Sequence, residues 1–136
     1  MKASNFDMVQ MLNILAKYEN IKLPQKISYA ILKNLKFLQD EYKIYSSQLK
    51  QIYNSYQSYY VKDKNGEPQI SQNGIPIVDN DHKESFDNEI SELLNGEIDF
   101  EMHTINEDLF DYEDADKYDA LTPVQISELI GVLCRK

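Results

Sequence analysis

Apolar side chains recur along residues 25–61 at steps that alternate between three and four residues. A repeat of about 3.5 residues is typical of a helix that lies along another helix. No glycine or proline interrupts the segment, and Pro24 stands just before its first turn. Such a helix would be roughly 55 Å long, against roughly 30 Å for a compact domain of this size, so we expect part of it to project or to meet another chain. The repeat positions are Ile31, Leu35, Leu38, Tyr42, Tyr45, Leu49, Ile52, Tyr56 and Tyr59.

Three shorter segments show the spacing of amphipathic helices. Residues 5–18 and 82–94 each carry an apolar stripe at helical spacing, and Asn95-Gly96 ends the second of them. A last helix begins with a hydroxyl residue followed directly by proline, which is a common helix start. The expected cap residues of the three helices are Ser4 or Asn5, Asp81 and Thr122.

Two segments show strand patterns. Asn73-Gly74 divides residues 69–78 into the two arms of a β-hairpin, and Pro76 confines its arm to a sheet edge. Residues 97–105 alternate between apolar and polar side chains, which predicts a half-buried strand with an acidic outer face. We therefore expect one α+β domain over residues 1–136, without internal repeats. Its long helix packs with two or three shorter helices, and the hairpin and the strand form a small antiparallel sheet.

The charge of the chain is concentrated in one segment. The net charge is −9, and residues 97–119 hold ten acidic residues against one lysine, whereas thirteen acidic and thirteen basic residues elsewhere cancel. A negative protein with a single arginine is a poor match for nucleic acid, because phosphate contacts need lysine and arginine. One interpretation of the segment is an exposed, solvated acidic loop; the other is a surface for a partner protein with a basic surface. The carboxylates expected to make that contact are Asp108, Asp111, Glu113, Asp114 and Asp116.

The second half of the long helix is rich in tyrosine. Six tyrosines lie between residues 42 and 60, and each combines a large apolar ring with a polar hydroxyl group. One interpretation is that these rings cover the end of an intramolecular core. The other is a partner-binding patch, since tyrosine is enriched at interfaces, with Tyr45, Tyr53 and Tyr56 as its contact residues. Residues 31–59 could also join copies of the chain in a homo-oligomer.

The sequence shows no signature of catalysis or of a cofactor. There is no phosphate-binding glycine loop, no nucleophile motif and no His or Cys pair at metal-ligand spacing. The carboxylates of the acidic segment do not match a calcium-binding loop, which leaves an incidental cation site or a metal-dependent enzyme as weak alternatives. Cys134 is the only cysteine and is interpreted as a small apolar residue. With no apolar span and no apolar stretch behind a basic start, we expect a cytoplasmic protein that contacts no membrane.

The order of several short stretches gives a resemblance that covers nearly the whole chain. It resembles a family of small uncharacterised bacteriophage and prophage proteins, catalogued as a domain of unknown function. The resemblance implies a phage setting and brings no catalytic residues. The stretches are Lys22-Leu23-Pro24, Ile27, Tyr29-Ala30, Lys62-Asp63-Lys64-Asn65-Gly66, Glu89-Ile90-Ser91-Glu92-Leu93-Leu94 and Leu121-Thr122-Pro123.

Three functions follow as hypotheses. The first is a non-catalytic protein that binds a host or phage protein, for example as an inhibitor of a host defence enzyme that handles nucleic acid. The second is a structural or assembly component of a phage particle or homo-oligomer. The third, a divalent-metal-dependent enzyme, has the least support, and we expect the protein not to be an enzyme.

Overall fold

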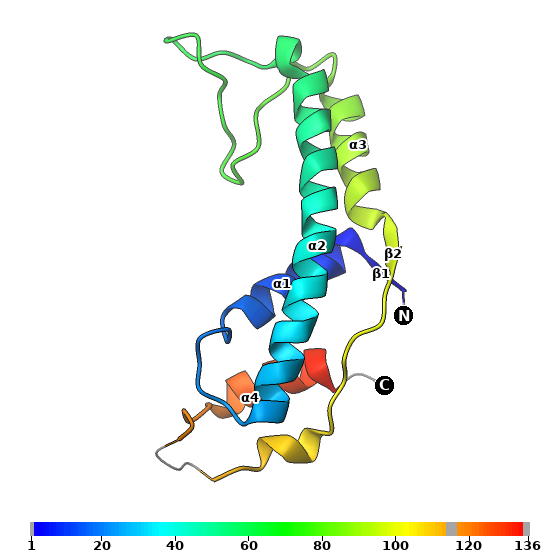
Figure 1. Cartoon of the computed structure of the whole chain (residues 1–136). Helices are drawn as coiled ribbons and strands as arrows, with labels where there is room; N and C mark the ends of the chain where they lie inside the picture. Colours follow the sequence, from blue (N-terminus) through cyan, green and yellow to red (C-terminus); the bar gives the residue numbers. More distant parts are fainter. Residues whose placement is uncertain (1, 114–116, 135–136) are drawn as a thin grey trace. The chain divides into compact units, whose positions relative to one another are not determined.

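The computed structural model describes residues 2–113 and 117–134, and these form four α-helices and a pair of antiparallel strands (Figure 1). The α+β class, with one long helix, shorter helices and a small antiparallel sheet, is confirmed. The helices are α1 (Asn5–Ala16), α2 (Gln25–Ser55), α3 (Lys83–Asn95) and α4 (Pro123–Leu133). The strands are β1 (Lys2–Ser4) and β2 (Glu97–Asp99), and η1 (Gln57–Tyr59) and η2 (Glu107–Phe110) are short 3-10 turns. No helix of the described residues is both long and apolar enough to cross a membrane.

Contacts between residues divide the chain into two compact units. The first unit comprises Met1–Tyr42 and Glu97–Lys136, and the second comprises Lys43–Gly96. The single domain expected over residues 1–136 remains a prediction.

The long helix α2 is unbroken over 31 residues, as its heptad pattern predicts. It ends at Ser55 and not at residue 61, because the chain that follows is held by contacts distant in sequence. The carbonyl of Tyr59 accepts a hydrogen bond from the N–H of Asp79 at 2.9 Å, and the N–H of Val61 donates to the carbonyl of Ile77 at 2.8 Å. These bonds use backbone N–H and C=O groups that a longer α2 would have needed for its own hydrogen bonds. A local apolar pattern contains no information about such distant partners.

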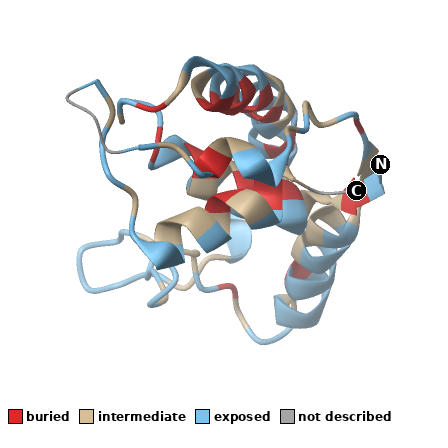
Figure 2. Ribbon diagram, turned by 90° about the horizontal axis from the view of Figure 1, so that it is seen from below, coloured by how far each residue is buried: buried red, intermediate tan, exposed pale blue. Residues whose placement is uncertain are grey.

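Apolar side chains of α1, α4 and the first half of α2 make up most of the core of the first unit, and Figure 2 maps the buried positions. Burial of one such side chain stabilises the fold by roughly 1.5–3 kcal/mol. Along the repeat of α2, burial is almost complete from Ile31 to Leu38 and then decreases, since Tyr42 and Tyr59 remain 39% and 38% exposed. The largest fully buried side chains of this core are Met8, Leu15, Ile27, Ile31, Leu38, Leu129 and Leu133.

Two of the three expected helix caps are confirmed. Ser4 and Asp7 form a capping box at the start of α1, and Thr122 and Gln125 form one at the start of α4. The cap expected for α3 at Asp81 is wrong, because α3 begins after His82, whose side chain makes no capping hydrogen bond. The N–H of His82 instead donates to Oδ1 of Asp79 at 3.1 Å, so the turn before the helix is fixed by a residue further upstream.

The sheet differs from the predicted one. The predicted strand over residues 97–105 is regular only in β2, and its partner is β1, where Ala3 lies opposite Ile98. The hairpin at 69–78 does not join this sheet and forms isolated bridges instead. A strand of three residues is too short to show alternation, which is why β1 has no signal in the sequence.

The residues that follow β2 are attached to α2 by a side chain and not by a strand. The amide of Asn34, which is 2% exposed, donates from Nδ2 to the carbonyl of His103 at 2.9 Å and accepts from the N–H of His103 at 2.8 Å. The N–H of Ile105 then donates to the carbonyl of Leu133 at 3.0 Å. An amide side chain thus satisfies both backbone groups of one residue, as a neighbouring strand would.

An internal repeat of eight residues organises the chain between α2 and α3, so the expectation of no internal repeats is wrong. Residues 61–68 read VKDKNGEP and residues 69–76 read QISQNGIP, with Asn-Gly and Pro at the same places. The N–H of Val61 donates to the carbonyl of Ile77, that of Ile77 to Gln69, and that of Gln69 to Val61, at 2.8, 2.9 and 2.9 Å. Residues eight apart thus form a closed ring of three backbone hydrogen bonds.

Three segments of the chain, which we call arms, extend from this ring of hydrogen bonds. Two are tight hairpins that turn at Gly66 and Gly74, whose φ angles of 80° and 77° are readily adopted by glycine. The third arm consists of the end of α2 and the start of α3, and the bond from the N–H of Asp79 to the carbonyl of Tyr59 closes it. The hairpin predicted at Asn73-Gly74 is therefore present, as one arm of three.

A polar contact in the first unit predicts a dependence of stability on pH. Oε1 of Glu128 accepts from Nζ of Lys17 at 3.1 Å and from the hydroxyl of Tyr18 at 3.0 Å. The ammonium group and the hydroxyl hold the pKa of Glu128 below its ordinary value, whereas burial and the carboxylate raise the pKa of Tyr18 to about 12. Because the carboxylate form is the one stabilised by folding, its contribution is complete above the unfolded-state pKa of about 4.3.

We expect this contribution to disappear as the pH falls through the lowered pKa of Glu128. The loss is small, less than about 1 kcal/mol, because Lys17 is largely exposed. Urea unfolding of the wild type and of Glu128→Gln from neutral to acid pH measures it. The stabilities of the two proteins should converge at acid pH, and a constant difference at every pH would contradict the assignment.

Candidate partner-binding surfaces

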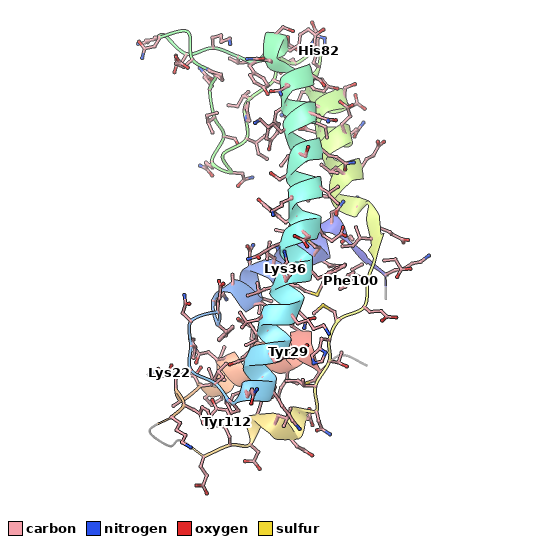
Figure 3. The ribbon with its side chains drawn as sticks, viewed as in Figure 1. Lys22, Tyr29, Lys36, His82, Phe100 and Tyr112 are labelled. Carbon is pink, nitrogen blue, oxygen red and sulfur yellow. The ribbon has the colours of Figure 1, made fainter. Side chains whose placement is uncertain are left out.

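The acidic segment is anchored to the first unit at several points. Phe110 closes η2 and is 7% exposed. The N–H of Lys22 donates to Oδ2 of Asp119 at 2.8 Å, and the N–H of Asp119 donates to the carbonyl of Lys22 at 2.7 Å. The hydroxyl of Tyr112, which Figure 3 shows near Lys22, donates to the carbonyl of Asp119 at 2.9 Å. Phe110 is buried, whereas Leu109 and Tyr112 are half-buried.

Exposed carboxylates flank these anchors on residues 107–113, which we call the acidic loop. Its backbone is ordered by short-range bonds: Oδ1 of Asn106 accepts from the N–H of Asp108 at 2.9 Å, and the N–H of Asp111 donates to the carbonyl of Asp108 at 3.1 Å. Because the backbone is fixed, the charges keep their spacing when a partner approaches, which lowers the entropy cost of binding. The exposed carboxylates are Glu107, Asp108, Asp111 and Glu113.

The structure brings together three of the five carboxylates predicted to contact a partner. Asp108, Asp111 and Glu113 lie in the acidic loop, whereas Asp114 and Asp116 fall outside the described residues. Within the described part of the chain, no three His, Cys, Asp or Glu side chains gather in a way that could hold a metal ion. Exposed like charges at this spacing repel one another modestly in water, and a cationic surface relieves that repulsion.

The predicted tyrosines lie in the second unit, where Phe86 of α3 is the centre of a ring cluster. The ring of Tyr56 meets Phe86 edge to face at 5.0 Å between centroids, and Tyr53 lies at 6.0 Å from the same ring. Tyr59 stacks on His82 at 3.6 Å. Contacts of this kind add stability beyond the apolar area that they bury.

Burial of the tyrosines favours the core interpretation over a free docking patch. Tyr45 is 9% exposed, and Tyr53 and Tyr56 are half-buried. Burial raises the pKa of Tyr53, and a hydrogen bond with Glu89 is the main cause of the raised pKa of Tyr56. These rings therefore already have intramolecular roles, and their contact with a partner remains a prediction.

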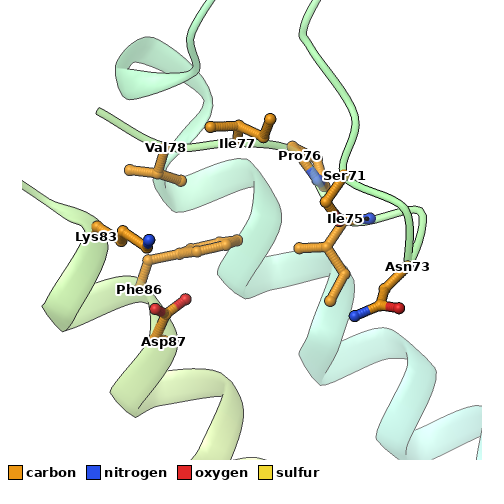
Figure 4. A pocket seen from close by; sticks show the side chains of 9 residues that line it. All are labelled: Ser71, Asn73, Ile75, Pro76, Ile77, Val78, Lys83, Phe86 and Asp87. Carbon is orange, nitrogen blue, oxygen red and sulfur yellow. Dashed lines mark hydrogen bonds between the residues drawn. The ribbon is translucent and has the colours of Figure 1, made fainter. Parts of the chain in front are cut away.

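A hollow of about 410 Å³ lies beside this cluster, between the second hairpin arm and the start of α3 (Figure 4). Phe86, Val78 and Ile75 give it an apolar lining, and Lys83 and Asp87 add one charge of each sign. Ile70 and Ile77, on the same arms, are 55% and 39% exposed. The exposed apolar surface of the second unit thus includes the repeat and not only the tyrosines. The matching Asn-Gly-x-Pro motifs were the signal in the sequence that could have drawn attention to it.

Comparisons of the chain with models of protein families, with curated proteins and with solved structures found no match. Function is therefore inferred from the residues themselves. The acidic loop is the surface for which the structure gives both a fixed backbone and a definite chemistry. The tyrosine cluster stabilises the second unit.

Proposed function

We propose that the protein is a non-catalytic binding protein whose acidic loop recognises a basic surface on a partner protein. One observation carries this proposal: the exposed carboxylates of the loop stand on a backbone anchored through Phe110, Tyr112 and the paired Lys22 and Asp119. A preorganised charged surface gives specificity and fast association, because it attracts the partner before contact.

The sign of the charge defines the kind of partner. At a net charge of −9 the chain repels phosphate backbones, so nucleic acid is not the ligand that we propose. A protein surface rich in lysine and arginine is complementary to the acidic loop. Surfaces that normally hold nucleic acid have this character, and an acidic protein bound there would exclude the nucleic acid.

The resemblance to bacteriophage proteins suggests where such a partner would be found. In a phage setting the protein would act in the cytoplasm of the host, and its partner would be a host or phage protein. An enzyme of host defence that handles nucleic acid fits the required charge. The acidic loop by itself requires only a basic protein surface, and the choice of a host defence enzyme is part of the proposal.

We expect that neutralising the acidic loop abolishes capture of the partner. The variant carries Asp108→Asn, Asp111→Asn and Glu113→Gln, and the measurement is affinity capture from host lysate, identified by mass spectrometry and repeated at increasing salt. Loss of each charge contact costs roughly 0.2–1 kcal/mol if it is exposed and more if it is buried by the partner. For three exposed contacts the combined loss is roughly 0.6–3 kcal/mol, or about threefold to 150-fold in affinity, and it is larger where the partner buries them.

A matched control separates local charge from net charge. Glu67→Gln, Glu84→Gln and Glu92→Gln remove the same number of exposed carboxylates from the second unit. This control should capture the same proteins as the wild type, and capture should weaken with salt for both. If the loop variant captures the same proteins as the wild type, the acidic loop is not the binding surface.

Exposed apolar residues on α2 support a second candidate, an assembly component that associates with copies of itself. Ile44 is 57% exposed and Tyr42 is 39% exposed, one helical turn beyond the well-buried part of the heptad repeat. Tyr45 and Tyr56 are unsuitable for testing this idea, because they are buried or half-buried and their replacement would disturb packing. Sedimentation that shows a monomer at all concentrations would remove this candidate.

A further inference from the structure

A groove in the first unit has a chemistry opposite to that of the acidic loop. It measures about 450 Å³ and lies between the first turns of α2 and the residues after β2. Gln25, Lys26 and Tyr29 form one wall, and His103 and Ile105 form the other. The rings of Tyr29 and His103 meet edge to face at 5.2 Å between centroids. The groove therefore combines aromatic rings with a cation, and none of the described residues that line it is a carboxylate.

Two features give the groove a fixed shape. Buried Asn34 holds the backbone of His103 through two hydrogen bonds, and the N–H of Ile105 is bound to the carbonyl of Leu133. The wall opposite Tyr29 is thus attached to α2 and to the end of α4. Because the wall does not have to be ordered on binding, a ligand retains more of its interaction energy.

The α2 side of the groove carries lysines, although the first unit as a whole is negative. Lys26 lines the groove, and Lys33 follows two turns later on the same helix. Nζ of Lys33 lies 5.6 Å from the centroid of the Tyr29 ring, which is 54% exposed. Lys26 therefore contributes one cation to the lining of the groove, and Lys33 places a second over the exposed ring. This arrangement is complementary to an anionic ligand that also has an apolar group.

We propose that this groove binds an acidic peptide segment of a partner protein, with an apolar side chain against Tyr29 and Ile105 and carboxylates near Lys26 and Lys33. An enclosed small-molecule site would bury most of its ligand, whereas Gln25, Lys26 and Tyr29 are exposed, as suits a chain that runs along an open groove. Nucleic acid fits less well, because Glu107 follows the groove wall closely in the chain and opposes a continuous row of phosphates. A peptide can place its few carboxylates on the lysine side alone.

The test uses a fluorescein-labelled synthetic peptide in which glutamates flank a central phenylalanine. Two control peptides replace the glutamates by glutamines or the phenylalanine by alanine. Binding to the full-length protein is measured by fluorescence anisotropy, and the site is located by amide chemical shifts in NMR spectra. We expect saturable binding of the first peptide alone, with the largest shifts at Tyr29, His103 and Ile105.

Variants of the groove distinguish this proposal from a general attraction to lysine. Lys26→Gln with Lys33→Gln should weaken binding roughly five- to tenfold, and Tyr29→Ala should weaken it by at least about fivefold. Lys43→Gln with Lys50→Gln, also exposed on α2, should leave the affinity unchanged. Since these side chains are exposed, the variants should fold, and their thermal unfolding confirms it.

Several results would overturn the proposal. They are the absence of saturable binding, equal binding of the glutamine peptide, equal loss in both lysine pairs, or shifts that map outside the groove. The acidic loop is not altered in any of these variants. If the groove variants contradict this proposal, the proposed function of the acidic loop still stands. If the loop variant keeps its partner, the proposed peptide-binding groove still stands.

Discussion

Replacing Phe86 by alanine is expected to destabilise the second unit by about 3–5 kcal/mol, which is the usual cost of removing a buried aromatic ring. Phe86 is 2% exposed and is the shared neighbour of Tyr53 and Tyr56. It also lines the hollow between α3 and the second hairpin arm. The two tyrosines would lose the ring that they contact.

Urea unfolding, followed by circular dichroism and by hydrogen exchange of the α3 amides, measures this loss. The matched control is Phe6→Ala, because Phe6 is 50% exposed and its removal should change stability by less than about 1 kcal/mol. Equal effects of the two substitutions would mean that the ring cluster does not hold α3. In that case the tyrosines would again be available for a partner.

Replacing Asn34 by leucine is expected to cost about 2–4 kcal/mol, because the change removes two hydrogen bonds and leaves the N–H and the carbonyl of His103 without partners. Leucine has a similar volume, so the loss reports the polar contacts more than a cavity. Asn34→Asp keeps one acceptor but loses the donor and places a charge at a site that is 2% exposed. It should therefore be destabilising as well.

The measurement combines urea unfolding with exchange of the His103 amide proton. Gln39→Ala, at an exposed position of the same helix, is the control and should leave both unchanged. Exchange at His103 should become much faster in Asn34→Leu even under conditions where the fold persists. Unchanged exchange would show that the residues after β2 are held by other contacts, and the fixed wall of the proposed groove would lose its basis.

The two proposed surfaces carry opposite charges and lie in different parts of the first unit. The acidic loop presents carboxylates on an anchored backbone, and the groove presents lysines beside exposed rings. A protein with both surfaces could contact two partners of opposite charge, or two regions of one partner. The loop and groove variants, examined with the same captured proteins, distinguish these cases.

The sequence by itself determined the helices and the distribution of charge. The unbroken repeat of α2, the capping boxes at Ser4 and Thr122, and the glycine that ends α3 are all local patterns. Helix formation depends mainly on residues three or four positions apart, so these patterns are visible in the chain. The position of acidic residues is also a property of the sequence, and three of the five carboxylates predicted to contact a partner lie on one anchored loop.

Only the tertiary structure decided which distant residues pair. The end of α2 at Ser55, the pairing of β1 with β2, the contact of Asn34 with His103 and the packing of the tyrosines on Phe86 all join residues far apart in the chain. The sequence around a tyrosine at helical spacing is the same whether its ring packs against α3 or faces solvent, because its neighbours along the chain do not change. Burial depends on what the rest of the chain brings to that side, and for this reason the sequence left both a core and a partner-binding patch open for these tyrosines.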